Sequence, residues 1–310
     1  MERIILTAKP TDDYELIDSG QEEKLERYAE VILVRPDPQA LWERSLGEGE
    51  WDKADARYTR EGKGGGWEVR SGATPATSWP ICYGGFTFSI KPTSFKHTGL
   101  FPEQISNWEW IKKTLSQEHY RNPPEKVLGK DPFIQNFSGV PKVLNLFSYT
   151  GGATLAAAQA GAQVTHVDAS KIAVSWAREN AQLSLLADKP IRWIIEDVML
   201  FVRREIKRGN KYDAIIMDPP AFGHGPNDEL WKIEENFLTL MQLCEELLSD
   251  NPLFVLISGY AAGYSPLAFA YNLDRFEKKY GGSIEYGDLC IEQKNSPRVL
   301  PCGIFARWNR

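Results

Sequence analysis

The stretch VLNLFSYTGGATLAAAQAGAQVTHVDAS, residues 143–170, decides the fold of this chain. Residues 143–147 are apolar apart from one Asn, a composition typical of a buried parallel strand. The glycine pair at 151–152 interrupts that strand, and small residues at 154–160 then favour a helix. The stretch therefore begins as a strand, a tight turn and a helix in succession.

A second strand follows this helix. Gly161 ends the helix, and residues 163–167 predict a strand with Asp168 at its tip. Together the elements form a β-α-β unit with a carboxylate at the end of the second strand. A dinucleotide-binding turn needs the pattern Gly-x-Gly-x-x-Gly, whereas this turn offers only Gly151 and Gly152. The pattern therefore disfavours a pyrophosphate site and leaves open another nucleotide-like cofactor.

The composition indicates a soluble globular protein. A chain of 310 residues has room for two domains, and its 42% hydrophobic and 25% charged residues are ordinary values. We expect a cytoplasmic protein without a membrane span, because no apolar run reaches 18 residues and the first residues lack a secretory signal. We expect no metal site and no disulfide framework, because the four cysteines form no Cys-x-x-Cys pair.

The charges are unevenly distributed. Residues 1–90 hold 11 Lys plus Arg against 17 Asp plus Glu, and the rest of the chain holds 25 of each. Proteins that bind nucleic acid usually present a basic face. The overall charge therefore does not require a nucleic-acid partner, although a local basic patch is compatible with the neutral part.

Three regions follow from the residue pattern. Residues 1–92 alternate short β-like runs with Pro- and Gly-rich turns, which predicts a small, mostly β domain. Residues 93–141 predict a connecting helix at 102–117 and a proline-rich linker at 119–141. Residues 142–310 alternate strands and helices and predict a cofactor-binding domain.

The third region predicts an α/β fold. Strands are expected at 142–147, 163–167, 191–195, 212–217 and 252–258, helices at 153–160, 170–183, 197–208 and 230–249, and a terminal hairpin at 283–293 and 299–308. This order predicts a doubly wound, mostly parallel, seven-stranded Rossmann-like sheet with an antiparallel edge. The smaller β domain precedes it.

Polar groups end four of the predicted strands, and in an open α/β sheet these ends meet at one edge. Asp168 can accept hydrogen bonds from both hydroxyls of a ribose. Asp197 can accept from an adenine amine, while Val198 supplies a backbone N–H. The turn at 151–152 lets the backbone approach an amino-acid tail. The fourth strand ends in Asp-Pro-Pro-Ala-Phe, residues 218–222.

Each group also has a purely structural interpretation. The glycine pair is compatible with an ordinary turn, and Asp168 and Asp197 are compatible with helix N-caps. Asp218 is harder to explain in this way, because the two prolines after it fix a rigid, extended turn without amide donors. The four groups in this order favour a cofactor site.

The order and spacing of these groups resemble the class I S-adenosylmethionine-dependent methyltransferases over residues 142–310. VLNLFSYTGG, VDAS, EDV and IIMDPPAF are similar to the family of bacterial large-subunit ribosomal RNA cytosine-C5 and guanine-N7 methyltransferases. The resemblance implies S-adenosylmethionine as cofactor and RNA, ribosomal RNA in particular, as substrate. FKHTGLFPEQ, residues 95–104, also resembles that family's lead-in, which implies a lid over the cofactor, although His97, Glu103 and Ile105 depart from its pattern.

The resemblance and the strand ends together give the expected cofactor-binding residues. These are Thr98, Phe101, Gln104, Asn145, Phe147, Tyr149, Thr150, Gly151, Gly152, Asp168, Ala169, Ser170, Asp197, Val198 and Asp218.

The target atom follows from a missing cysteine. Carbon-5 methylation of cytosine needs a thiolate that adds to the ring. In the cytosine-C5 relatives this cysteine follows a serine on the strand after Asp-Pro-Pro, but here Ser258 is followed by Gly259. A nitrogen acceptor needs only in-line positioning of its lone pair. The sequence therefore favours a nitrogen target.

The Asp-Pro-Pro-Ala-Phe segment supplies the expected catalytic residues. Asp218 and the carbonyls of Pro219 and Pro220 would hold an amine hydrogen, and Phe222 would stack on a planar ring. His224 would help to remove a proton or would simply be an exposed loop histidine.

Other functions remain open at this point. One is a methyltransferase that acts on a small molecule or a protein side chain, and another is a cofactor-binding regulator without turnover. A nicotinamide-dependent dehydrogenase is a further alternative. Tyr260 either lines the pocket or packs.

Overall fold

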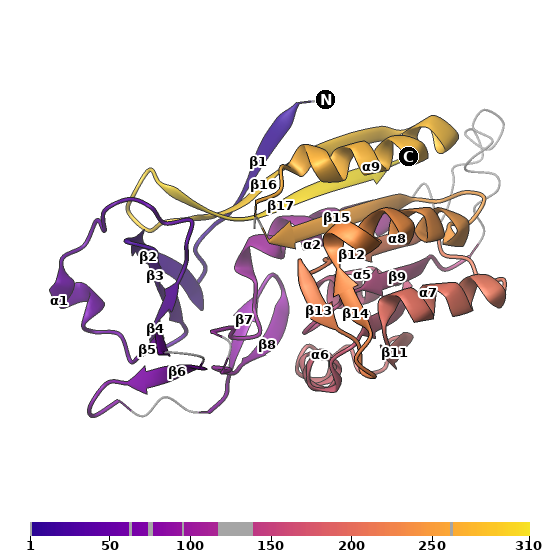
Figure 1. Ribbon diagram of the computed structural model, residues 1–310. Helices are drawn as coiled ribbons and strands as arrows, with labels where there is room; N and C mark the ends of the chain where they lie inside the picture. Colours follow the sequence, from indigo (N-terminus) through magenta and orange to yellow (C-terminus); the bar gives the residue numbers. More distant parts are fainter. Residues whose placement is uncertain (1, 62–63, 74–76, 95, 117–138, 261–262) are drawn as a thin grey trace. The chain divides into compact units, whose positions relative to one another are not determined.

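The chain folds into two compact units. A computed structural model describes residues 2–61, 64–73, 77–94, 96–116, 139–260 and 263–310 (Figure 1). Unit 1 comprises Met1–Ile5, Asn107–Asp288 and Gly303–Arg310, and unit 2 comprises Leu6–Ser106 and Leu289–Cys302. Unit 2 thus takes in a segment of the predicted terminal hairpin. Residues 119–138 of the predicted linker lie outside the described residues.

The main sheet confirms the predicted α/β fold. Its order is β1-β16-β17-β15-β12-β9-β10-β11. The five adjoining strands β15, β12, β9, β10 and β11 are parallel, and β17 pairs antiparallel with β15. Their bounds are β1 Arg3–Ala8, β9 Lys142–Leu146, β10 Gln163–Asp168, β11 Ile191–Ile195, β12 Ala214–Met217, β15 Phe254–Tyr260, β16 Ser283–Glu292 and β17 Val299–Asn309.

The sheet has eight strands rather than seven because β1 joins it at the β16 edge. The sequence Arg-Ile-Ile-Leu-Thr-Ala of β1 indicates a strand, but the pattern alone predicts it to be part of the N-terminal β domain. Its partner strand begins at Ser283. No local pattern reveals a pairing across so many residues.

Helices follow the strands as expected, with two corrections. The helix predicted at 230–249 begins only at Ile233, because 230–232 forms a strand, β14, that pairs with β13. The helix α9 was missed, although Ser265 caps it and Pro266 opens it, both recognised start signals. Bounds are α2 Ile105–Leu115, α5 Gly152–Gln159, α6 Lys171–Leu183, α7 Val198–Lys207, α8 Ile233–Leu247, α9 Pro266–Tyr280, β13 Phe222–His224 and β14 Leu230–Lys232. None of the described helices is long and apolar enough to cross a membrane.

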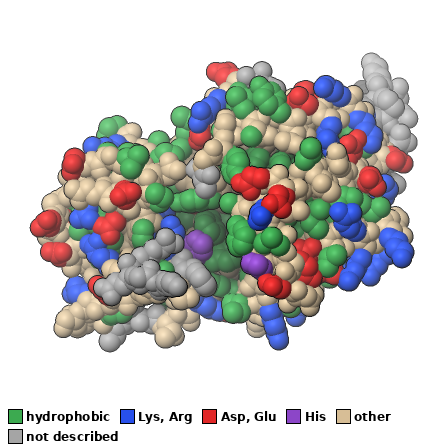
Figure 2. Space-filling view, viewed as in Figure 1, with side chains coloured by type: hydrophobic (Ala, Val, Ile, Leu, Met, Phe, Trp, Pro, Cys, Tyr) green, Lys and Arg blue, Asp and Glu red, His purple; other side chains and the backbone are tan. Residues whose placement is uncertain are grey.

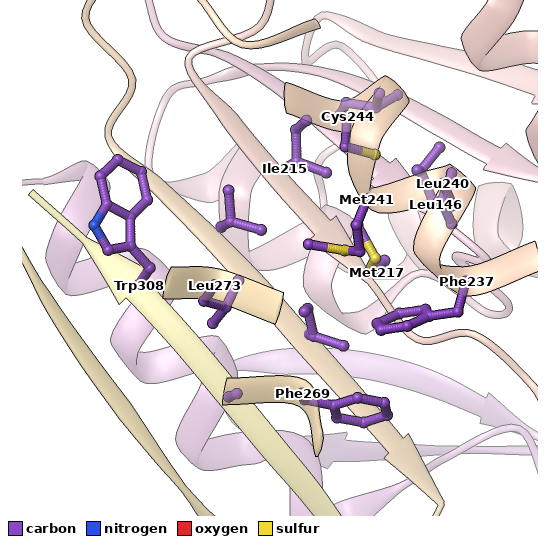
Figure 3. Packing of buried hydrophobic residues seen from close by; sticks show 14 of the residues in the cluster. Leu146, Ile215, Met217, Phe237, Leu240, Met241, Cys244, Phe269, Leu273 and Trp308 are labelled. Atoms are coloured by element: carbon purple, nitrogen blue, oxygen red, sulfur yellow. The ribbon is translucent and has the colours of Figure 1, made fainter. Parts of the chain in front are cut away.

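An apolar core holds α8 and α9 against the sheet. Ile215 and Met217 of β12 lie in one cluster with Met241 of α8 and Leu273 of α9, and all four are fully buried (Figure 3). Full burial of such a side chain stabilises the fold by about 1.5–3 kcal/mol. The core therefore fixes the position of the end of β12, and with it the position of Asp218, which follows.

Unit 2 is mostly β, as predicted. It holds a five-stranded sheet of order β2-β3-β4-β5-β6 and the hairpin β7-β8. Bounds are β2 Tyr14–Gly20, β3 Glu23–Tyr28, β4 Val31–Pro36, β5 Ala56–Glu61, β6 Gly64–Val69, β7 Trp79–Tyr83 and β8 Phe86–Ile90, with a short helix α1 at Glu48–Trp51 and a 3₁₀ turn η1 at Pro102–Gln104.

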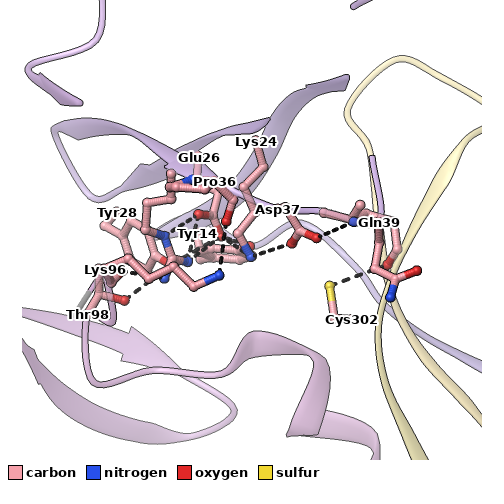
Figure 4. A network of polar contacts seen from close by, with 12 residues as sticks. Tyr14, Lys24, Glu26, Tyr28, Pro36, Asp37, Gln39, Lys96, Thr98 and Cys302 are labelled. Atoms are coloured by element: carbon pink, nitrogen blue, oxygen red, sulfur yellow. Dashed lines mark hydrogen bonds and ion pairs between the residues drawn. The ribbon is translucent and has the colours of Figure 1, made fainter. Parts of the chain in front are cut away.

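A buried ionic network lies inside unit 2 (Figure 4). The carboxylate of Glu26 accepts hydrogen bonds from Arg35 Nε (2.7 Å) and from the hydroxyl of Tyr14 (2.8 Å). Burial alone would raise the pKa of Glu26, but the charges of Arg35 and Lys24 lower it. The buried carboxylate is therefore paired and hydrogen-bonded, as burial of a charge requires.

Candidate active site

The sheet places two turns at its switch point. Along the chain the strands run outward from β9 to β10 and β11, whereas β12 lies on the other side of β9. In open α/β sheets, ligands bind beyond the carboxyl ends of the strands where the order reverses. The turn after β9, residues 147–152, and the turn after β12, residues 218–222, both begin there.

The turn after β9 has an unusual backbone. Phe147 and Tyr149 have φ values of +54° and +46°, and Gly151 follows with +90°. Left-handed conformations in bulky residues are rare and cost about 1–3 kcal/mol each, and they cluster at functional sites. Ser148, between Phe147 and Tyr149, stabilises the turn. Its hydroxyl donates a hydrogen bond to Asn145 O (2.7 Å), and its N–H donates one to Val167 O (3.1 Å).

The two glycines serve different purposes. Gly151 is required because its φ of +90° suits glycine, and an added Cβ would lie 3.1 Å from Ala177 Cβ. Gly152 is required by packing, because an added Cβ would lie 2.2 Å from Cζ2 of Trp108 on α2. The sequence interpretation assigned the pair to approach by an amino-acid tail. The structure gives Gly152 a packing reason that is independent of any ligand.

Asp168 ties the first two strand ends together. Its Oδ2 accepts a hydrogen bond from Tyr149 N (2.8 Å), and its Oδ1 accepts one from Ser170 N (2.8 Å). Ser170, not Asp168, caps α6, because its hydroxyl oxygen accepts from Ala173 N (3.2 Å). Burial raises the pKa of Asp168. A carboxylate has about four lone-pair positions, so about two remain for a ligand.

Asp197 does act as a helix cap. Its Oδ1 accepts a hydrogen bond from Leu200 N (2.9 Å) at the start of α7. The side chain of Val198 packs in the core, so only its backbone can take part in a site. A Cβ added to Gly225, in the loop between β13 and β14, would lie 3.1 Å from Asp197 Cβ. That loop therefore lies against the end of β11.

Asp218 is the first residue of the second turn. Its N–H donates to Leu146 O (3.3 Å), which links the ends of β12 and β9. The residue is exposed at the sheet edge. The protein around its carboxyl still restricts hydration and raises its pKa to about 6, against the opposing hydrogen bond with Ser258. Asp218 is thus largely ionised at pH 7 and can gain a proton under mildly acidic conditions.

Trp231 on β14 connects the two turns, and the sequence analysis missed it. Its Nε1 donates to Pro220 O (2.7 Å), and its ring lies 4.8 Å from that of Phe147 between centroids. Trp231 and Pro219 are buried, whereas Pro220 is exposed. One lone pair of the Pro220 carbonyl is therefore already used. The only signal in the sequence is an apolar residue within a segment that the pattern predicts to be a helix.

The hairpin after the second turn presents an aromatic face. Phe222 is 57% exposed, and its ring lies 5.2 Å from the ring of His224, edge to face. Nδ1 of His224 is 2.8 Å from Oδ1 of Asp228. Tyr260, at the end of β15, is 44% exposed. Phe222 is therefore free to stack on a planar group.

Two expected cofactor-binding residues use their polar groups inside the protein. Asn145 is buried, and its Nδ2 donates to Thr154 Oγ1 (2.9 Å). Thr150 is also buried, and its carbonyl accepts from Asn180 Nδ2 (2.9 Å). These contacts hold the turn after β9 in place. Ala169 is half-buried beside Asp168.

The lead-in residues belong to unit 2. Thr98 is fully buried and donates from Oγ1 to the hydroxyl of Tyr28 (3.4 Å). Phe101 is half-buried with its ring 5.6 Å from that of His97, and Gln104 N donates to Phe101 O (3.1 Å). Their contact with a cofactor stays a prediction.

The cysteines offer no nucleophile at the strand ends. Ser258 and Gly259 occupy the place on β15 where a cysteine would stand. Cys244 lies buried in α8, and burial raises the pKa of its thiol to about 12. Cys290 and Cys302 are buried too, and Cys82 is exposed in unit 2. A nucleophilic thiolate needs a lowered pKa, so Cys244 is unsuited to that role.

Comparison with known proteins identifies relatives of the whole chain and of its second half. A sequence profile of S-adenosylmethionine-dependent methyltransferases matches residues 125–267. The crystal structure of an S-adenosylmethionine-dependent methyltransferase from Agrobacterium tumefaciens is 38% identical, with a TM-score of 0.87 over 99% of this chain and 93% of that one.

Two curated relatives match over shorter stretches. Ribosomal RNA large subunit methyltransferase K/L from Shewanella sp. strain MR-4 is 35% identical over 113 residues, 36% of this chain. Ribosomal RNA large subunit methyltransferase I from Serratia proteamaculans is 35% identical over 133 residues, 43% of this chain. The matched stretches span only 16% and 33% of those two proteins.

Proposed function

Because this chain belongs to the family of S-adenosylmethionine-dependent methyltransferases, we propose that it transfers a methyl group to a nitrogen of a base in RNA, ribosomal RNA in particular. The names of the curated relatives support the RNA substrate. The turn of residues 218–222, with its raised carboxyl pKa and exposed Phe222, is the observation that carries the nitrogen target.

The first three strand ends fit S-adenosylmethionine. Asp168 has lone pairs left for the two ribose hydroxyls, after its bonds to Tyr149 and Ser170. Asp197 has its Oδ2 left for an adenine amine, after its Oδ1 caps α7. The left-handed turn with Gly151 would let backbone approach the amino-acid tail. S-adenosylmethionine would supply an electrophilic methyl group on a sulfonium.

The second turn would position the acceptor. The Asp218 carboxylate would accept a hydrogen bond from an N–H group of the base, and Phe222 would stack on the ring. The chain would hold the nitrogen lone pair in line with the methyl group, so that the N–C bond would form as the C–S bond breaks and S-adenosylhomocysteine leaves. The proton lost by the nitrogen would pass to the Asp218 carboxylate or to water, and no covalent enzyme intermediate would form. Holding the two groups in line supplies most of the catalysis. This account agrees with the absence of a cysteine beside Ser258.

A protein or small-molecule substrate is the second candidate, and the charge of the hairpin favours it. Asp228 and Glu229 flank the exposed aromatic face, and Glu234 and Glu235 follow it, against Lys232 alone. Carboxylates around an aromatic platform attract a cationic amine more readily than a phosphate backbone.

Methyl-labelled S-adenosylmethionine distinguishes these candidates. The chain is incubated with separated RNA, protein and metabolite fractions from cells that lack it. We expect label in RNA with the wild-type chain and with Asp250→Asn, a control that changes an exposed carboxylate before the start of β15, at the edge of the sheet opposite the site. Asp218→Asn should reduce that label roughly 100-fold, as expected for the loss of a positioned acceptor. Label that enters protein or metabolites alone would overturn the proposal.

A further inference from the structure

A hollow lies at the edge of the sheet opposite the candidate active site. It is formed where β9, β10, β11 and β12 begin, and its volume is about 470 Å³. Four cationic residues line it: Lys142, Lys189, Arg192 and Lys211. All belong to unit 1. Along β10 the hollow is about 17 Å from Asp168, from five steps of about 3.3 Å.

The carboxylate in this hollow does not cancel the positive charge. Glu205 is fully buried, and it accepts hydrogen bonds from the hydroxyl of Tyr212 (2.7 Å), from Asn210 Nδ2 (2.8 Å) and from Arg208 Nη1 (2.9 Å). Burial acts to raise the pKa of Glu205, but these bonds lower it overall. Its lone pairs are thus directed to protein donors. The lining residues carry four positive charges against this one negative charge.

Two of the cations are available for a ligand. Arg192 Nη1 lies 3.3 Å from Glu205, and Lys211 Nζ donates to Glu246 O (2.6 Å). The side chains of Lys142 and Lys189 are exposed and have no hydrogen-bond or ion-pair partner among the described residues. Two free ammonium groups beside an arginine suit a phosphate, whose oxygens accept several charge-assisted bonds.

The neighbouring surface is also basic. The helix α7 ends beside the hollow and carries three exposed basic residues, Arg203, Arg204 and Lys207, and exposed Arg208 follows it. Figure 2 shows Lys and Arg side chains gathered on the part of the face that carries α7. A basic surface of this kind concentrates anions near the hollow. The neutral total charge of residues 91–310 conceals this local excess.

We propose that this hollow binds a phosphate group, carried either by the RNA backbone or by a small phosphate compound. Lys142, Lys189 and Arg192 would contact the phosphate oxygens. In the first case the RNA would reach from the base at Asp218 and Phe222 to the other edge of the sheet, and only this case rests on the proposed function.

Protection of the lysines from acetylation tests the site directly. The full chain is treated with an acetylating reagent, alone, with inorganic pyrophosphate, or with a short oligoribonucleotide, and modification is read by mass spectrometry. We expect slower acetylation of Lys142 and Lys189, while Lys278, an exposed lysine on α9, serves as internal control. Protection by pyrophosphate supports a small-compound site and protection by the oligonucleotide alone supports an RNA site. Protection by neither would overturn the proposal.

The salt dependence of RNA binding tests the RNA case separately. Log K should fall less steeply with log[salt] in Lys142→Ala and Lys189→Ala, by about 0.7 for each lost phosphate contact. Lys278→Ala should leave the slope unchanged. Unchanged slopes in both hollow variants would exclude the RNA backbone as the ligand. The pyrophosphate experiment does not require methyl transfer to RNA, so it remains decisive if the proposed function fails.

Discussion

Replacing Gly152 by alanine gives the sharpest test of the packing behind the turn after β9. The new Cβ would lie 2.2 Å from Cζ2 and 2.6 Å from Cε2 of Trp108. Carbon atoms pack at about 3.5–4.0 Å, so ring and helix must separate by more than about 1 Å. Trp108 is buried, so its ring has little room to move. Overpacking of this kind costs about 1–3 kcal/mol, and we expect the free energy of unfolding to fall by that amount.

Removing the indole provides the control. In a Trp108→Leu background the clashing atoms are absent, so Gly152→Ala should cost less than about 0.5 kcal/mol, in line with the usual non-additivity of contacting residues. Gly151→Ala is the matched variant. Its cost comes from a φ of +90° and from Ala177, so Trp108→Leu should not relieve it. Urea unfolding followed by circular dichroism measures the free energy of unfolding of each variant. Equal costs of Gly152→Ala in both backgrounds would refute the reasoning.

Four further predictions concern the site. Asp168→Ala should weaken S-adenosylmethionine binding by about 1–3 kcal/mol in calorimetric titration, because ligand hydroxyls and Tyr149 N lose their acceptor; unchanged affinity would remove Asp168 from the site. Methyl transfer should decline as pH falls below about 6, roughly tenfold per unit, because protonated Asp218 no longer accepts as well. A rate of methyl transfer without a step near pH 6 would count against this role of Asp218. The raised pKa also means that the contribution of Asp218 to the free energy of unfolding decreases as pH rises from about 4 to about 6. Trp231→Phe should lower the free energy of unfolding by about 1 kcal/mol through loss of the bond to Pro220, and an unchanged urea midpoint would contradict this. Cys244→Ala should leave the rate of methyl transfer within about twofold, because a buried neutral thiol is no nucleophile; a complete loss of activity in a folded variant would restore a cysteine mechanism.

Much of the fold was predictable because its signals are local. The apolar residues of β9, β10 and β12 are followed by Ser148, Asp168 and Asp218, so the sequence becomes polar at or just after each strand end. Asp168 and Asp218 were therefore placed at strand ends from the pattern alone. The parallel order followed from the alternation of strands and helices.

The rest depends on contacts between distant residues. Ser148 bonds to Val167, 19 positions away, and nothing in the sequence distinguishes it from an ordinary loop serine. Left-handed φ angles at Phe147 and Tyr149 are contrary to what their side chains favour. Trp231 was assigned to a helix because the pairing of β14 with β13 is not visible in its own short segment. The sequence predicts a ligand-binding role for Gly152, because its contact with Trp108 is a tertiary contact that no local pattern reveals.

Mass spectrometry of RNA nucleosides tests the central claim most directly. RNA is compared between cells that lack this chain and the same cells supplied with the wild-type chain or with Asp218→Asn. We predict that one nitrogen-methylated nucleoside is absent without the chain and returns only with the wild type. Identical nucleosides in all three samples, or loss of 5-methylcytidine instead, would contradict the account.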